Sequence, residues 1–67
     1  MTLHEAIAMV LGEARAPLSA AEIAAAINER KLYVRADRQP VPPNQIHARV
    51  SNRPRLFTRA DDGIRLA

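Results

Sequence analysis

The first part of the chain carries an apolar stripe at the spacing of an α-helix. Its members are Leu3, Ile7, Val10, Leu11 and Ala14. Residues three and four positions apart lie on one face of a helix, so the stripe predicts an amphipathic helix with one buried side. Thr2 and Glu5 have the spacing of a capping box, in which each side chain binds a free amide at a helix start. Pro17 disfavours helix at the residue before it. A first helix is therefore predicted over about residues 3–15.

A second capping box opens an alanine-rich segment. Ser19 and Glu22 have the required spacing, and alanine has the highest helix propensity of any residue. One side of this segment carries Ile23, Ala26 and Ile27. We expect a second helix over about residues 20–30, whose small side chains let another helix pack closely against it.

A short third helix is predicted after a loop. The segment Lys31 to Val41 contains only a brief β-prone run and is expected to be irregular. Pro42 and Pro43 then suit the first turn of a helix, because the amide hydrogen that proline lacks has no partner there. Pro54 limits the helix at its other end. The predicted span, about residues 42–52, is short enough for a recognition helix.

Two β-prone runs close the sequence, at about residues 55–59 and 64–67. The Asp62-Gly63 pair between them is a strong signal for a hairpin. An isolated hairpin is unstable in water, so we expect its apolar side chains to pack against the helices. These side chains are Phe57, Ile64 and Leu66. With Pro17-Leu18 available as a very short extra strand, the order of elements predicts an α+β winged helix-turn-helix, in one domain over residues 1–67.

Charge divides the chain into two unlike halves. Residues 1–30 hold two arginines and four glutamates, a net charge of −2, whereas residues 31–67 hold eight cations and three aspartates, a net charge of +5. Seven of those eight cations are arginine, whose planar fork suits phosphates and guanine edges. The alternative is an ordinary solvated basic surface. The chain has no cysteine, which excludes disulfides and thiol chemistry and fits a reducing cytoplasm.

The sequence resembles the HARE-HTH domain, a winged helix found in RNA polymerase delta subunits, some restriction enzymes and eukaryotic chromatin regulators. The resemblance is carried by Leu3 to Ile7 with Val10-Leu11, by Ala16 to Ala24 with Ile27, and by Val41 to Val50. In the last segment the family pattern is Thr-Pro-x-x-Thr-Ile-x-Ala-x-Ile. Val41 and Gln45 replace its two threonines. The resemblance implies a DNA-binding or chromatin-associated module, in a fold that also serves protein contacts.

The predicted third helix has a polar face suited to a DNA groove. Ile46 and Val50 define its buried side, which turns Asn44, Ala48 and Ser51 outward. Asparagine, glutamine and arginine can each make two hydrogen bonds to a base edge, although an ordinary polar helix face has the same composition. Together with the basic hairpin, this face gives our predicted DNA-binding residues: Asn44, Gln45, His47, Arg49, Ser51, Asn52, Arg53, Arg55, Arg59 and Arg65.

These features predict a non-enzymatic module that binds double-stranded DNA. Tyr33 and Phe57 are the only aromatic residues, too few to stack the bases of a single strand. No nucleophile and base pair, phosphate loop, metal cluster or cofactor motif is recognisable, and no stretch is apolar enough to cross a membrane. We expect a cytoplasmic, nucleoid-associated protein in transcription regulation, chromosome organisation or modified-DNA recognition. The alternative is a protein-interaction module that docks on RNA polymerase or a larger DNA-processing enzyme. The oligomeric state stays open.

Overall fold

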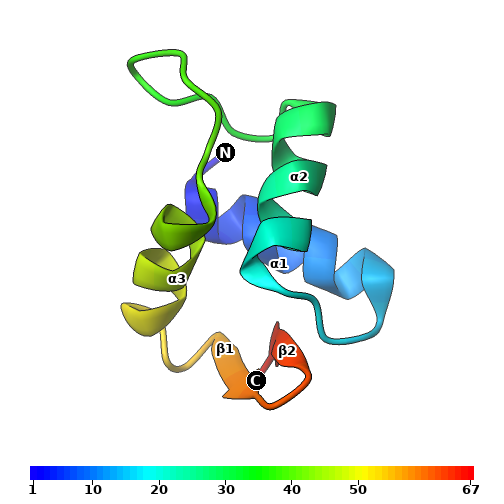
Figure 1. The fold of residues 1–67 in the computed structure, drawn as a ribbon. Coiled ribbons are helices and arrows are strands. Elements are labelled where there is room, and N and C mark those ends of the chain that lie inside the picture. Colours follow the sequence, from blue (N-terminus) through cyan, green and yellow to red (C-terminus); the bar gives the residue numbers. More distant parts are fainter.

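The computed structural model describes residues 1–67 and has the predicted order of elements. Three helices, α1 (Leu3–Ala14), α2 (Ala20–Arg30) and α3 (Pro43–Ser51), precede an antiparallel hairpin of β1 (Phe57–Ala60) and β2 (Gly63–Leu66). The helices surround a common centre, and the hairpin, which we call the wing, lies below them in Figure 1. This arrangement confirms the α+β winged helix, with helix ends within a residue of those predicted.

Both predicted capping boxes are present. The Thr2 amide donates to Glu5 Oε1 at 2.8 Å and the Glu5 amide donates to Thr2 Oγ1 at 3.2 Å. Ser19 and Glu22 exchange the same pair of bonds at 2.9 and 3.1 Å. These contacts satisfy amides that have no partner within the helix, which explains why α1 and α2 begin where the sequence predicted.

The core is entirely apolar. The predicted stripes of α1 and α2 meet the inner side of α3, except for Ala14, which is exposed at the end of α1. The largest fully buried side chains are Leu3, Ile7, Ile23, Ile27 and Ile46. Phe57 and Ile64 of the wing are also buried, with 4% and 3% of their surface exposed. The wing is therefore part of the domain's single core and is held to the helices by burial of apolar surface.

Leu18 extends the wing as the predicted short third strand. Its amide donates to the Ile64 carbonyl at 3.0 Å, and the Ile64 amide donates to the Leu18 carbonyl at 2.8 Å. Gly63 lies beside this bridge with a φ of 135°, and a Cβ there would come within 2.8 Å of the Leu18 carbonyl oxygen. Glycine is thus required at this position by a close approach of two backbones.

Two expectations for the wing are corrected. The hairpin closes on Asp61 and Asp62, within the predicted turn at residues 60–63, but β1 begins at Phe57 and not at about residue 55, because residues 54–56 form a turn after α3. Leu66 does not pack into the core: 42% of its surface is exposed. It lies at the open end of the hairpin, where it lines a hollow beside the end of α1 instead of facing the centre of the domain.

The loop between α2 and α3 has no regular structure, as predicted, but it is anchored. The Asn28 side chain accepts from the Val41 amide at 2.8 Å and donates to the Val41 carbonyl at 3.0 Å. Val41 itself is buried in the core, so the chain is fixed where it enters α3. None of the three helices combines the length and apolar character needed to cross a bilayer.

Candidate nucleic-acid interface

The outer face of α3 is polar and open. Ile46 and Val50, four residues apart, have 0% and 3% of their surface exposed, which turns the other side of the helix to solvent. The exposed residues on that side are Asn44, His47, Ala48, Ser51 and Asn52, while Gln45 and Arg49 are half-buried on its flanks. The orientation of α3 predicted from the sequence is therefore confirmed.

Arg59 joins the wing to this face. In the hairpin register Arg59 is paired with Ile64, so its side chain leaves the sheet on the side that faces the helices. Its Nη2 atom donates to the His47 carbonyl at 2.9 Å and to the Ser51 hydroxyl at 2.6 Å. The positive charge lies against the C-terminal half of α3, where it complements the helix dipole. The wing and α3 thus form one continuous polar surface.

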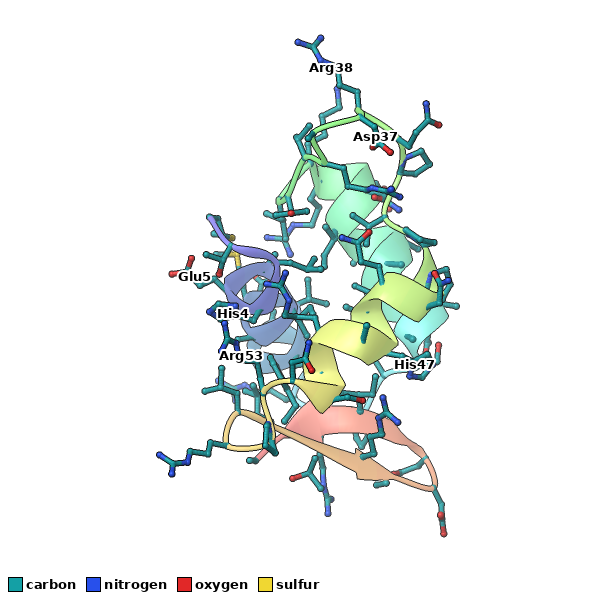
Figure 2. All side chains as sticks on the ribbon, turned by 90° about the vertical axis from the view of Figure 1, so that its left-hand side faces the viewer. His4, Glu5, Asp37, Arg38, His47 and Arg53 are labelled. Atoms are coloured by element: carbon teal, nitrogen blue, oxygen red, sulfur yellow. The ribbon has the colours of Figure 1, made fainter.

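Arg49 points toward α1. Its Nη1 atom lies 3.4 Å from Nδ1 of His4, a residue 45 positions earlier in the chain. A guanidinium can only donate hydrogen bonds, so in this contact Nδ1 of His4 can serve only as the acceptor. In Figure 2, His4 lies on α1, on one side of α3, and His47 marks the opposite side. This contact had no signal in the sequence, because it joins two positions far apart in the chain.

Arg53 and Arg55 lie in the exposed turn that joins α3 to β1. The backbone of this turn is fixed by bonds from the Arg53 amide to the Val50 carbonyl at 3.1 Å and from the Phe57 amide to the Arg53 carbonyl at 3.2 Å. Their side chains make no hydrogen bond or ion pair within the protein. They extend the polar surface of α3 beyond its C-terminal end.

Arg65 leaves the wing on the other face from Arg59. It is paired with Thr58 in the register, and both are exposed. Arg65 lines an open hollow with Arg15 and Gly12, at the end of α1. Successive side chains of a strand point to opposite faces, so the residue after the core-facing Ile64 is expected on the outer face. This alternation is the sequence signal for the placement of Arg65. The structure therefore brings Arg59 to α3 but directs Arg65 away from it.

Three of the four glutamates in residues 1–30 make hydrogen bonds or an ion pair within the protein. Hydrogen bonds from the capping residue three positions earlier hold the pKa of Glu5 and of Glu22 below the ordinary value. Glu13 forms an ion pair with Arg30 across α1 and α2. The Arg30 guanidinium lowers the pKa of that carboxyl, and the carboxyl raises the pKa of Arg30. Glu29 is the only glutamate without such a contact.

The arginines from α3 onward are used differently. The two ion pairs of the structure join Arg30 to Glu13 and Arg35 to Asp37. No carboxylate lies within ion-pair distance of any arginine from α3 onward, which are Arg49, Arg53, Arg55, Arg59 and Arg65. Their charge is uncompensated inside the protein and is available to an anion outside it. No group of three or more histidine, cysteine, aspartate or glutamate side chains is arranged to hold a metal ion.

Comparison with known protein families identifies a match over nearly the whole chain. The model of the HARE-HTH family, whose description includes the words "ASXL, restriction endonuclease HTH domain", matches residues 1–66. No curated protein and no solved structure matches the chain.

Proposed function

The chain belongs to the HARE-HTH family of helix-turn-helix DNA-binding domains, and we propose that it binds duplex DNA with α3 in the major groove and the wing on the backbone. The observation that carries this proposal is the contrast in how charge is used. Carboxylates of the first half are engaged in caps and one ion pair, whereas five arginines on α3, the following turn and the wing have no carboxylate partner. Such an unpaired basic surface is the electrostatic footprint of a nucleic-acid partner.

The dimensions and side chains of α3 suit a major groove. An α-helix with its side chains is about 10–12 Å across, which fits a major groove about 12 Å wide, and the nine residues of α3 span about 14 Å at the helical rise. Asn44, Gln45 and Asn52 have amides that can pair with adenine edges, and Ser51 can reach a base or a phosphate. Among them, Ala48 is small and lets the helix axis approach the floor of the groove. His47 borders this surface on the wing side.

We propose that the arginines of the turn and the wing contact the phosphate backbone of the DNA. Arg53, Arg55 and Arg59 lie next to the C-terminal end of α3 and would contact phosphates that border the groove. Arg65 is on the outer face of the wing, beside Arg15 and directed away from α3, and is not counted among these contacts. Asp61 and Asp62 at the tip of the wing repel phosphate, so the contacts are expected from the strands. Together these residues give about three to five phosphate contacts, each with a salt slope of about −0.9.

We propose that Arg49 contacts the bases of the DNA, which requires its guanidinium to leave His4. In the free protein its guanidinium lies against His4. On DNA it would give up this long contact for a bidentate bond to a guanine edge, which is much stronger because both donors are used. Specificity from one short helix is modest, so a dimer or a host protein would add a second contact.

We place this activity at the nucleoid, in transcription regulation, chromosome organisation or recognition of modified DNA. Docking on RNA polymerase or a larger enzyme is the second candidate. It would use the side of α1 and α2, where Glu29 is the only glutamate not already engaged in the fold. Little free acidic charge is left there for a partner, and we rank this candidate second.

Binding of a labelled duplex to two variants separates the candidates. Arg53→Ala with Arg55→Ala removes two exposed side chains that make no hydrogen bond or ion pair in the protein, so the fold is kept. Loss of two phosphate contacts lowers affinity about 60-fold at about 0.1 M salt. Arg15→Ala, at the far end of α1, is the matched control and leaves affinity unchanged. The test includes random, methylated and unmethylated duplexes, which reports any preference for modified bases.

Equal affinity of the double variant and the wild type would refute the proposed interface. Under the docking alternative, the double variant still captures RNA polymerase or the host enzyme, and the wild type shows no measurable affinity for duplex.

A further inference from the structure

The loop of residues 32–42 projects from the domain at the end opposite to the wing. Figure 1 shows it at the top, on the same side of the molecule as α3, with the wing at the bottom. In Figure 2, which views that side directly, α3 lies between the loop above and the wing below. A duplex seated on α3 would therefore extend toward the wing at one end and toward this loop at the other.

The loop is braced by its own side chains. Arg35 donates to Asp37 Oδ2 at 2.9 Å and to the Pro40 carbonyl at 3.4 Å, and the Gln39 amide donates to Asp37 Oδ1 at 3.0 Å. The Arg38 amide closes a turn on the Arg35 carbonyl at 3.0 Å. With the Asn28 anchor at the base, these contacts fix the course of the chain at the tip. A fixed tip can contact a ligand with little loss of conformational entropy.

The side chain of Arg38 takes no part in these contacts. Asp37 neutralises Arg35, whereas Arg38 has no hydrogen-bond or ion-pair partner for its side chain and extends from the tip into solvent (Figure 2). Its φ of 62° places it in the left-handed region, which costs about 1–2 kcal/mol for a residue other than glycine. The fold thus holds an arginine at a position where glycine would be easier to accommodate.

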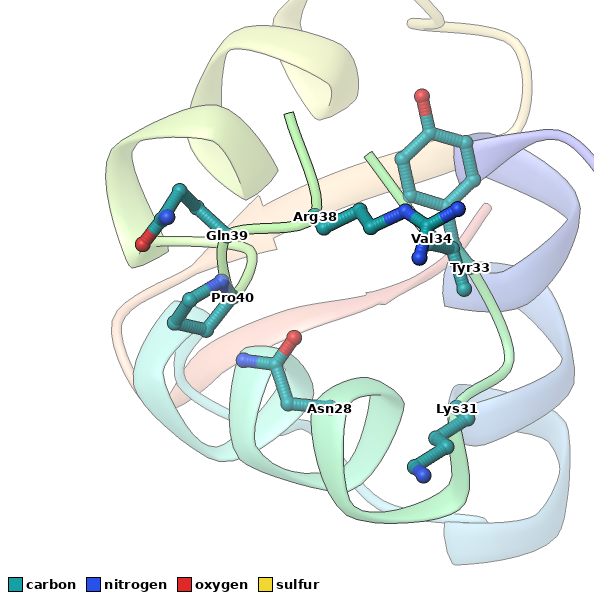
Figure 3. A pocket seen from close by; sticks show the side chains of 7 residues that line it. All are labelled: Asn28, Lys31, Tyr33, Val34, Arg38, Gln39 and Pro40. Atoms are coloured by element: carbon teal, nitrogen blue, oxygen red, sulfur yellow. The ribbon is translucent and has the colours of Figure 1, made fainter. Parts of the chain in front are cut away.

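The surroundings of Arg38 also favour an anion. It lines an open hollow between the loop and the end of α2, shown in Figure 3, whose only charged lining residues are Arg38 and Lys31. The adjacent first turn of α3 carries no acidic residue, unlike the first turns of α1 and α2. The one carboxylate of the loop, Asp37, is paired with Arg35, so neither the loop nor the first turn of α3 holds an unpaired acidic side chain that would repel a phosphate.

From these observations we infer that Arg38 is a second backbone clamp, which contacts a phosphate of the duplex at the end of α3 opposite the wing. The inference rests on the proposed function, because it needs a duplex seated on α3. Clamps on both sides of the helix would fix its position along the groove more firmly than the wing does alone.

The test compares two arginines with the same backbone conformation. Arg38→Gly removes the proposed contact and relieves the left-handed strain, so the variant stays folded. Arg15→Gly makes the same change at φ 54°, at the end of α1 on the side away from α3 (Figure 1). Duplex affinity is measured by fluorescence anisotropy over a range of salt concentrations.

We expect Arg38→Gly to weaken binding about eightfold at about 0.1 M salt and to reduce the salt slope by about 0.9. Arg15→Gly leaves both quantities unchanged, and Arg38→Lys keeps the slope because it keeps the charge. If the wild type binds and Arg38→Gly matches Arg15→Gly, the clamp is refuted while the α3 interface stands. If the wild type does not bind duplex at all, the proposed function and the clamp both fail.

Discussion

The two glycines of the chain should respond to alanine in opposite directions. At Gly63 a Cβ would lie 2.8 Å from the Leu18 carbonyl oxygen and 2.9 Å from its carbon, with φ at 135°. These are backbone atoms and cannot move aside without breaking the bridge between Leu18 and Ile64. At Gly12, within α1, a Cβ would meet no atom within 4 Å. The local geometry therefore predicts both the sign and the size of each effect.

The cost of Gly63→Ala has two parts. Backbone strain contributes about 1–3 kcal/mol, and loss of the two hydrogen bonds of the bridge contributes about 1 kcal/mol each. The expected loss of about 3–5 kcal/mol is a large part of the roughly 3–10 kcal/mol available to a domain of this size. Gly12→Ala instead gains about 0.5–1 kcal/mol, because alanine favours the helix and the site is open.

Urea denaturation followed by circular dichroism measures both changes. At about 4–8 °C per kcal/mol, Gly63→Ala should also lower Tm by more than about 10 °C, while Gly12→Ala raises it slightly. A Gly63→Ala variant as stable as the wild type would show that the wing does not approach Leu18 as described. A destabilised Gly12→Ala variant would show that the outer side of α1 is covered.

Two further predictions concern side chains that fix the ends of elements. The lowered pKa of Glu5 and Glu22 means that the unfolded chain takes up protons first as pH falls. The stabilisation that these two carboxylates give to the folded state is fully present above about pH 4.5, the ordinary pKa of glutamate. It declines as the pH falls below that value. Replacing both residues by glutamine keeps the capping bonds and should flatten this decline in acid titrations of unfolding; an undiminished decline would contradict the assignment. Asn28→Ala should cost about 2 kcal/mol and accelerate hydrogen exchange of the Val41 amide, whereas unchanged exchange would rule out the anchor.

Local signals explain why so much of the fold was predictable. Capping boxes, proline positions and helical spacing act over three or four residues, so they located α1, α2 and α3 within a residue of their observed ends. The turn of the wing was predicted at residues 60–63 from the Asp62-Gly63 pair, and the hairpin closes within it on Asp61 and Asp62. Gly63 has a further role that the sequence did not indicate, because the backbone of Leu18, far away in the sequence, passes close by.

The sequence predicted which residues belong to the candidate site better than it predicted how their side chains are arranged. The exposed face of α3 followed from Ile46 and Val50, and strand alternation indicates that Arg59 and Arg65 lie on opposite faces of the wing. The contact of Arg49 with His4 and the bracing of the loop around Arg38 depend on tertiary packing and on a turn of unusual φ. Neither feature leaves a periodic pattern in the sequence from which it could be predicted.

The salt dependence of duplex binding tests the central claim most directly. Affinity of the wild type for a labelled duplex is measured by anisotropy between about 50 and 200 mM salt, a range over which phosphate contacts change affinity steeply. The proposed interface of α3 and wing predicts a log–log slope of about −2.7 to −4.5, from three to five phosphate contacts at about −0.9 each. Absence of binding at the lowest salt, or an affinity that does not change with salt, would contradict it.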